Sequence, residues 1–173
     1  GLAQEMTQEL RTSEEAARVA GQRAERVAEI ARRTSNAIVI LDEQGLIEWV
    51  NDGFTRVTGY TPEEAAGRQP SEFLHGPATE APAAAALSEL IREGRSGTAE
   101  ITNYARSGRA IVLRVEIAPL SSTAGTRGGF MVIASDITEQ RRATEALAVE
   151  RERLDLAVSG ADLGLWDWNP ATN

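Results

Sequence analysis

The hydrophobic and polar positions divide the chain into three zones, the first of which has the character of a helix. From Gly1 to Arg33 the residues are mostly Ala, Glu, Arg and Gln, with no proline and one interior glycine, Gly21. This composition favours helix, so we predict one coiled-coil-like N-terminal helix over residues 1–35. Small or apolar residues recur every seven positions in two rows, which are Ala3, Leu10, Ala17, Ala24 and Ala31, and Met6, Ser13, Ala20, Val27 and Thr34. Such a stripe either packs against a partner helix or lies on the chain's own domain.

Residues 36–136 change to short alternating runs separated by turn residues. Ala37 to Leu41 and Leu46 to Val50 predict a hairpin, because Asp42 to Gly45 between them are turn-forming residues. Asn51 or Asp52 can cap one short helix and Thr61 another, and an alanine-rich helix is predicted from Pro82 to Glu93.

Three further strands are predicted, over Thr98 to Tyr104, Ala110 to Leu120 and Phe130 to Ser135, with a loop from Ser121 to Gly129. The order of elements predicts an α+β fold. It has one antiparallel five-stranded sheet with short helices on one face, flanked by long N- and C-terminal helices.

The first strand and residues 130–134 of the last strand are apolar on both faces, so we expect both faces of the sheet to be covered. The domain's own helices cover one face, and the N-terminal helix, a partner subunit or both cover the other. We assign to this outer, dimer-forming surface Val39, Leu41, Met131 and Ile133 of the sheet, with Ala24 and Val27 of the first helix.

The third zone begins at Asp136, which can cap a helix over residues 137–159. A heptad-like seam runs through that helix at Ile137, Thr144, Leu147, Arg151, Leu154 and Val158. Residues 160–173 predict a loop and then a new strand from Leu163 to Trp168, so a second domain starts there and is not completed.

Charge and composition exclude several classes of function. The 18 Lys and Arg residues against 26 Asp and Glu give a net charge of −8, which is the wrong sign for binding nucleic acid. No apolar run approaches the length of a membrane span, so we expect no direct membrane contact and a cytoplasmic location, although a parent protein could be attached to a membrane. There is no cysteine, and His75 is the one histidine. We therefore expect no metal site and no catalytic constellation, and the chain is not an enzyme by itself.

Four fragments together resemble the PAS domain family. They are Ile47 to Phe54, Thr58-Gly59-Tyr60, Pro62 to Gly67, and Asp136-Ile137-Thr138. The resemblance implies a PAS fold over residues 36–136 and an output helix after Asp136. Residues 154–168 are similar to the start of a second PAS domain, which implies a multidomain parent with a histidine kinase or cyclic-nucleotide output that is absent here.

Within that family, Phe73 to Pro77 and Asn103 to Gly108 look most like the flavin-binding light-oxygen-voltage branch. That branch forms its photoadduct through a cysteine, which this chain lacks. Its flavin-edge contacts are two asparagines and a glutamine, and the resemblance places Asn103, Leu113 and Ala134 at these positions. We expect a pocket near these residues and His75, without tightly bound flavin. His75 precedes the long helix, so we also expect no haem.

These observations predict a homodimeric PAS module that relays a signal through Asp136, Ile137 and Thr138 into the following helix. Two alternatives stay open. One is a sensor that binds a small molecule, or flavin non-covalently, in the pocket. The other is a constitutive dimerisation spacer that carries no signal of its own.

Overall fold

The computed structural model describes residues 1–121 and 127–165. Helix α1 (Leu2–Arg33) is one uninterrupted helix of 32 residues. Every side chain from Leu2 to Ile30 is exposed, so the alternative in which this helix lies on its own domain is wrong. Packing against a partner helix stays a prediction.

The core is a five-stranded antiparallel sheet, as predicted. Its strands are β1 (Ala37–Leu41), β2 (Ile47–Val50), β3 (Gly97–Tyr104), β4 (Ala110–Ser121) and β5 (Arg127–Asp136), and their spatial order is β2-β1-β5-β4-β3. The first and last strands therefore lie side by side inside the sheet, and β3 forms one edge. Ser121 pairs with Arg127, so the loop predicted over Ser121 to Gly129 is wrong at both its ends. Its centre lies outside the described residues.

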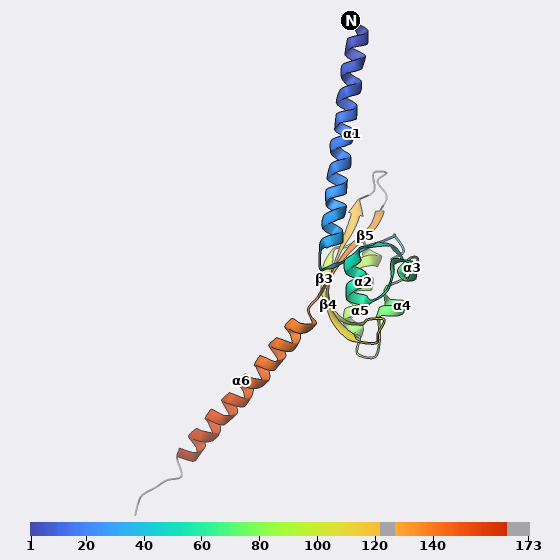
Figure 1. Cartoon of the computed structure of the whole chain (residues 1–173). Helices are drawn as coiled ribbons and strands as arrows, with labels where there is room; N and C mark the ends of the chain where they lie inside the picture. Colours follow the sequence, from blue (N-terminus) through green and yellow to red (C-terminus); the bar gives the residue numbers. More distant parts are fainter. Residues whose placement is uncertain (122–126, 166–173) are drawn as a thin grey trace, which may run out of the picture. The chain divides into compact units, whose positions relative to one another are not determined.

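Four helices lie on one side of the sheet (Figure 1). They are α2 (Asp52–Thr58), α3 (Pro62–Ala65), α4 (Ser71–Leu74) and α5 (Ala81–Glu93). Local chemistry sets their ends. Thr61 and Glu64 form the expected capping box on α3, and Gly94 ends α5 in the left-handed region with φ 67°.

The strand register corrects the assignment of the sheet's faces. Val39 pairs with Val132 and Leu41 with Phe130, and all four residues are buried in the core under the helices. The prediction that Val39 and Leu41 lie on the outer face was therefore wrong. Strand β1 is apolar at every position, so its pattern carried no information about which face turns toward the helices. Met131 and Ile133 lie on the opposite, outer face, where they are half-buried.

Helix α6 (Thr138–Leu165) belongs to a second unit that begins at Ile137. The carbonyl of Ile137 accepts a hydrogen bond from the Arg141 N–H at 2.9 Å, so Ile137 holds the N-cap position and Asp136 is the last residue of β5. The helix begins one residue later than predicted, and capping by the Asp136 side chain stays a prediction. The helix continues past Ser159 to Leu165. The loop expected from residue 160 and the start of the strand expected at Leu163 are therefore wrong. The rest of that expected strand, up to residue 168, lies outside the described residues. None of the helices described is long and apolar enough to cross a membrane.

Candidate functional site

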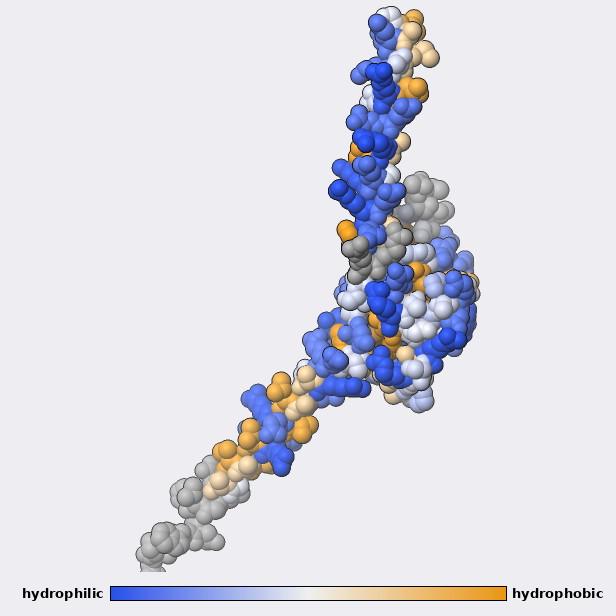
Figure 2. Space-filling model, viewed as in Figure 1, coloured by the Kyte–Doolittle hydropathy of each residue, from blue (hydrophilic) through white to orange (hydrophobic). Residues whose placement is uncertain are grey.

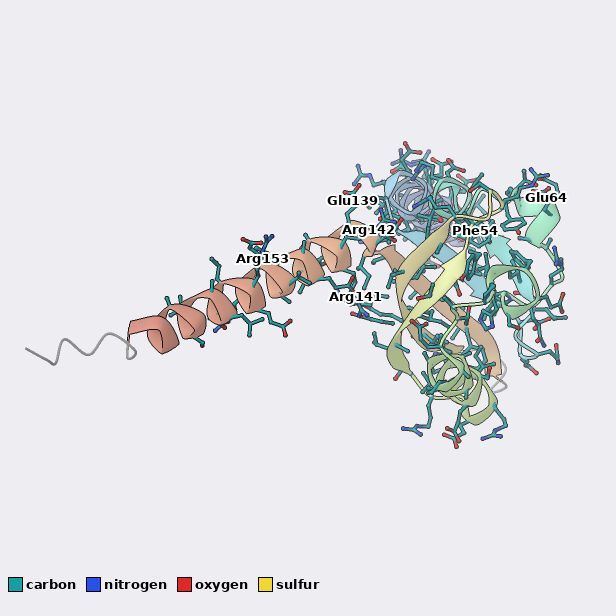
Figure 3. The ribbon with its side chains drawn as sticks, turned by 90° about the horizontal axis from the view of Figure 1, so that it is seen from below. Phe54, Glu64, Glu139, Arg141, Arg142 and Arg153 are labelled. Carbon is teal, nitrogen blue, oxygen red and sulfur yellow. The ribbon has the colours of Figure 1, made fainter. Side chains whose placement is uncertain are left out.

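A cavity of about 400 Å³ lies between the inner face of the sheet and the helices. Its size is that of a small-molecule site. Phe54 of α2, labelled in Figure 3, forms part of its wall and is 2% exposed. The apolar walls come from β1, β3, β4, β5, α4 and α5 and include Ala37, Val39, Leu74, Leu87, Ile101, Leu113, Val115 and Val132.

Small residues create this space. Ala37 of β1 pairs with Ala134 of β5, and Ala84 of α5 lines the same cavity. Because side chains alternate between the two faces of a strand, both paired alanines point toward the helices. Larger residues at these three positions would fill volume that the neighbouring side chains leave open.

Polar groups of the lining gather where the cavity meets solvent. Exposed side chains at this mouth are Glu43, Gln44, Gln69, Ser71, His75, Ser88 and Arg92. Partial desolvation lowers the pKa of His75 from 6.5, which favours its neutral form. The charged side chains of the lining, Glu43 and Arg92, are exposed to water.

Two polar side chains, Thr58 and Asn103, are buried in the lining. The Thr58 hydroxyl donates to the Phe54 carbonyl at 2.8 Å and accepts from the Tyr60 N–H at 3.3 Å. Asn103 is 6% exposed, and within the described part of the chain its Oδ1 is the buried side-chain polar atom that lacks a hydrogen-bond partner. A buried acceptor in that state costs about 1–3 kcal/mol.

The four pocket residues predicted from sequence all line this cavity. Asn103, Leu113 and Ala134 come from adjacent strands, and His75 follows α4. Sequence reasoning missed the wall formed by α5 and the contribution of Ala37. The unusually small residues Ala83 to Ala86 in a helix with large apolar neighbours were a signal for that wall.

The residues of the cavity do not fit a flavin. Asn103 offers one polar contact of the kind that the light-oxygen-voltage branch uses. Leu113 is 2% exposed and Ala134 is 6% exposed, and neither side chain can hydrogen-bond a flavin edge. Pro70 and Ser71 line the region where that branch has its reactive cysteine.

A second buried asparagine joins α1 to the domain. Asn51 Oδ1 accepts from the Ile38 N–H at 2.8 Å and from the Phe54 N–H at 3.0 Å. Its Nδ2 donates to the carbonyls of Ala31, at 2.5 Å, and Asn36, at 3.1 Å. One side chain thus fixes the last turn of α1, the start of β1 and the N-terminus of α2.

The predicted signalling residues lie where β5 leaves the sheet. Asp136 ends β5 and is paired in register with Leu113 of β4, a cavity residue. Ile137 and Thr138 follow directly and are both buried. A residue of the cavity wall is therefore paired directly with the last residue of the strand that precedes α6.

Both long helices expose apolar side chains (Figure 2). On α6, Leu147 is 73% and Leu154 is 57% exposed, and these two residues are seven positions apart. Charged residues such as Arg142 and Arg153 project from the same helix (Figure 3). On α1, Ala24 and Val27 of the predicted dimer surface are exposed as well.

On the outer face of the sheet, Trp49 is 44% exposed and pairs with Ile40. Ile40 in turn pairs with Met131, and Ile38 with Ile133. The two central strands and β2 therefore present a contiguous apolar area on the side of the sheet away from the cavity.

The sequence matches the PAS domain family over residues 35–139. It is 32% identical over 114 residues to the bacterioopsin transcriptional activator of Halobacterium salinarum, covering 66% of this chain and 17% of that protein. It is 36% identical over 108 residues to a blue-light-activated histidine kinase of Rhizobium johnstonii, covering 62% of this chain and 31% of that protein.

The fold is similar to that of a solved RNA-binding light-oxygen-voltage receptor. The TM-score is 0.61 at 26% sequence identity, and the match covers 71% of this chain and 36% of that one. The chain spans less than a third of the length of the two relatives named above.

Proposed function

The chain belongs to the PAS domain family, and from that premise we propose that it is the sensor and relay module of a larger signalling protein. Its relatives include a histidine kinase and a transcriptional activator, which supports a sensory signalling role. The output activity, for example the kinase of a two-component system, then resides outside this chain. We propose that the chain works in the cytoplasm and is not itself an enzyme.

One observation carries the relay proposal. Leu113 lines the cavity and is paired with Asp136, the residue that ends β5 just before α6. A shift of β4 against β5 therefore changes the position from which α6 starts. Two states of this strand pair that differ by a few kcal/mol suffice for a switch.

We further propose that two copies of the chain associate. The exposed apolar residues of α1 and α6 and the apolar outer face of the sheet support this. Sedimentation of the full chain at micromolar concentration should show a dimer, and deletion of residues 1–33 should weaken it. A monomer at that concentration contradicts this part of the proposal.

The relay is tested in the intact parent protein. Residues are inserted one at a time after Gln140, and the output is measured. If α6 transmits its rotational phase to a partner helix, the output varies with a period of about seven residues. A monotonic fall with inserted length, or no change, would mean that α6 is only a tether and that the spacer alternative is right.

A second candidate function, small-molecule sensing, is favoured by the cavity. It is compatible with the relay, because a ligand in the cavity contacts both Leu113 and Ala134. Mass spectrometry of the purified chain under native conditions reports a retained small molecule and the number of subunits in one measurement.

A further inference from the structure

A second hollow opens on the surface of the domain, between the C-terminal end of α2 and the turn that joins β3 to β4. It has a volume of about 400 Å³ and is lined by Arg56, Val57, Thr58, Gly59, Ala105, Arg106, Ser107 and Arg109. Three of these lining residues are arginines, and none of the described ones is acidic. We propose that this arginine hollow binds a phosphate group, either as the free ion or on a small metabolite. The site is distinct from the relay through β5 and from the cavity under the helices, with which it shares Thr58.

The positive charge in the arginine hollow is only partly compensated. Arg106 Nη2 lies 2.7 Å from Oε1 of Glu64, which Figure 3 labels, so this charge is paired. Arg56 Nη2 donates to the Thr34 carbonyl at 2.7 Å, which is a neutral acceptor. The Arg109 guanidinium has no hydrogen-bond or ion-pair partner in the part of the chain that the structure describes. Two guanidinium charges therefore line the hollow without a carboxylate, in a chain whose net charge is −8.

Backbone contacts fix the floor of the hollow. The Arg106 N–H donates to the Thr58 carbonyl at 2.8 Å, and the Gly108 N–H donates to the Ala105 carbonyl at 2.8 Å. Gly59 has φ 78° and approaches Arg106 closely, since a Cβ at Gly59 would lie 3.4 Å from Arg106 Cβ. The end of α2 and the β3–β4 turn are thus held together without any ligand, so the bases of the three arginines are already in place.

The donor set matches a phosphate group. A guanidinium presents its N–H groups in a planar fork that binds two phosphate oxygens at once. The two uncompensated charges of Arg56 and Arg109 equal the charge of a phosphate dianion. The hydroxyl of Ser107, an exposed residue of the same lining, adds an O–H donor. All three arginines are exposed, so water screens the attraction and we expect weak, millimolar binding.

Inorganic phosphate is the probe that tests the site. It is titrated into the full 173-residue chain at about pH 8, where the dianion predominates, and sodium chloride holds the ionic strength constant. We expect saturable backbone amide shifts at Gly59, Arg106 and Ser107, with a dissociation constant of about 1 mM. Acetate carries a single charge and should bind about tenfold more weakly.

Two substitutions that each remove one positive charge form a matched pair. Arg109→Gln should weaken phosphate binding about tenfold, because it removes the guanidinium that has no partner in the described chain. Arg11→Gln removes the same charge from exposed α1 and should leave the affinity within about twofold. Arg109→Lys keeps the charge but not the planar fork, so its loss should lie between the two. Both arginines are exposed, and circular dichroism checks that the variants fold.

Adenosine monophosphate identifies the source of the phosphate group. An affinity equal to that of inorganic phosphate favours the free ion, and tighter binding favours a phosphorylated metabolite. Arg109→Gln should weaken the binding in either case.

Amide shifts that do not saturate at constant ionic strength, or an equal affinity for acetate, would overturn the assignment of phosphate. Equal losses in Arg109→Gln and Arg11→Gln would show that phosphate responds only to net charge, and would overturn the arginine hollow as its site. The insertion experiment after Gln140 is independent of these outcomes, so failure of this site can be told apart from failure of the relay.

Discussion

Two buried asparagines show how differently one residue type serves two regions of this protein. Asn51 is 1% exposed and makes four hydrogen bonds, two through Oδ1 and two through Nδ2. Asn103 is 6% exposed, and its Oδ1 accepts none within the described residues. Asn51 lies where three backbone segments converge, whereas Asn103 lines a cavity.

The difference separates a residue whose polar groups are all satisfied on folding from one whose amide oxygen is not. The partners of Asn51 are all backbone groups of this chain, so its amide is satisfied as soon as the domain folds. The amide oxygen of Asn103 is buried and has no hydrogen-bond partner within the described part of the folded chain. The unliganded domain therefore carries a cost at Asn103 that it does not carry at Asn51.

Replacing Asn51 should have the largest effect. Asn51→Leu removes all four bonds, leaves the Ile38 N–H without its side-chain partner, and leaves the Phe54 N–H with only the backbone carbonyl of residue 51, at 3.1 Å. We expect the free energy of unfolding to fall by about 3 kcal/mol or more. Urea unfolding of the full chain, followed by near-UV circular dichroism, measures it. Asn51→Asp keeps an acceptor for the two N–H groups and should lose less. Equal losses in the two variants would show that the accepted bonds contribute little.

A methyl group beside this junction should have the next largest effect. A Cβ at Gly53 would collide with the Asn36 carbonyl oxygen, which is itself a partner of Asn51 Nδ2. We expect Gly53→Ala to lower the free energy of unfolding by about 1–3 kcal/mol.

The matched control for this variant is Gly21→Ala. Nothing lies within 4 Å of a Cβ at Gly21, and alanine favours helix over glycine by up to about 1 kcal/mol. The helical content of the chain should therefore rise slightly. If both glycine variants behaved alike, the close approach of the chain at Gly53 would be unimportant for stability.

Replacing Asn103 should have the opposite sign. Asn103→Leu removes an unpaired acceptor and adds apolar surface to an apolar cavity, so the unliganded chain should become more stable by about 1 kcal/mol. The same urea experiment measures this change. A loss of stability as large as that of Asn51→Leu would mean that the two asparagines are equivalent, and the contrast between them would fail.

The smallest effect concerns pH. Partial desolvation lowers the pKa of His75 at the cavity mouth below its ordinary value of 6.5. The unfolded chain therefore binds a proton more readily than the folded chain, so stability should decrease as the pH falls through 6.5 and be fully present above it. Unfolding curves between pH 5.5 and pH 8 measure the slope. His75→Gln should remove this part of the slope, and an unchanged slope would assign it to other groups.

Sequence predicted a helix cap at Asn51 or Asp52, because asparagine and aspartate before a short helix are local signals, and the structure places the cap at Asn51. Its bonds to Ala31 and Asn36 were not predictable, since they depend on where the end of α1 meets the domain. The same limit applies to Val39 and Leu41. An entirely apolar strand does not indicate its inner face, and only the strand register with β5 resolved it.

Asn103 was identified as a pocket residue through the family resemblance, together with Leu113, Ala134 and His75. That its Oδ1 has no partner could not be predicted, because the hydrogen bonds of a side chain depend on every element around it. Helix α6 was predicted to end at residue 159, since the glycines after it were taken as a loop. An exposed helix with many strong helix formers before those glycines extends through them to Leu165.

The pairing of the first strand with the last has a mechanical consequence. Ala37 opens β1 and is paired with Ala134, two residues before the end of β5. The segment that precedes β1 and the segment that follows β5 therefore connect to the same end of the β1–β5 ladder. The hydrogen bonds of this antiparallel ladder run perpendicular to the strands. A pulling force applied through α1 and α6 would load these bonds one after another, beginning at this end. The domain is therefore built to unzip under low tension rather than to resist it by shear.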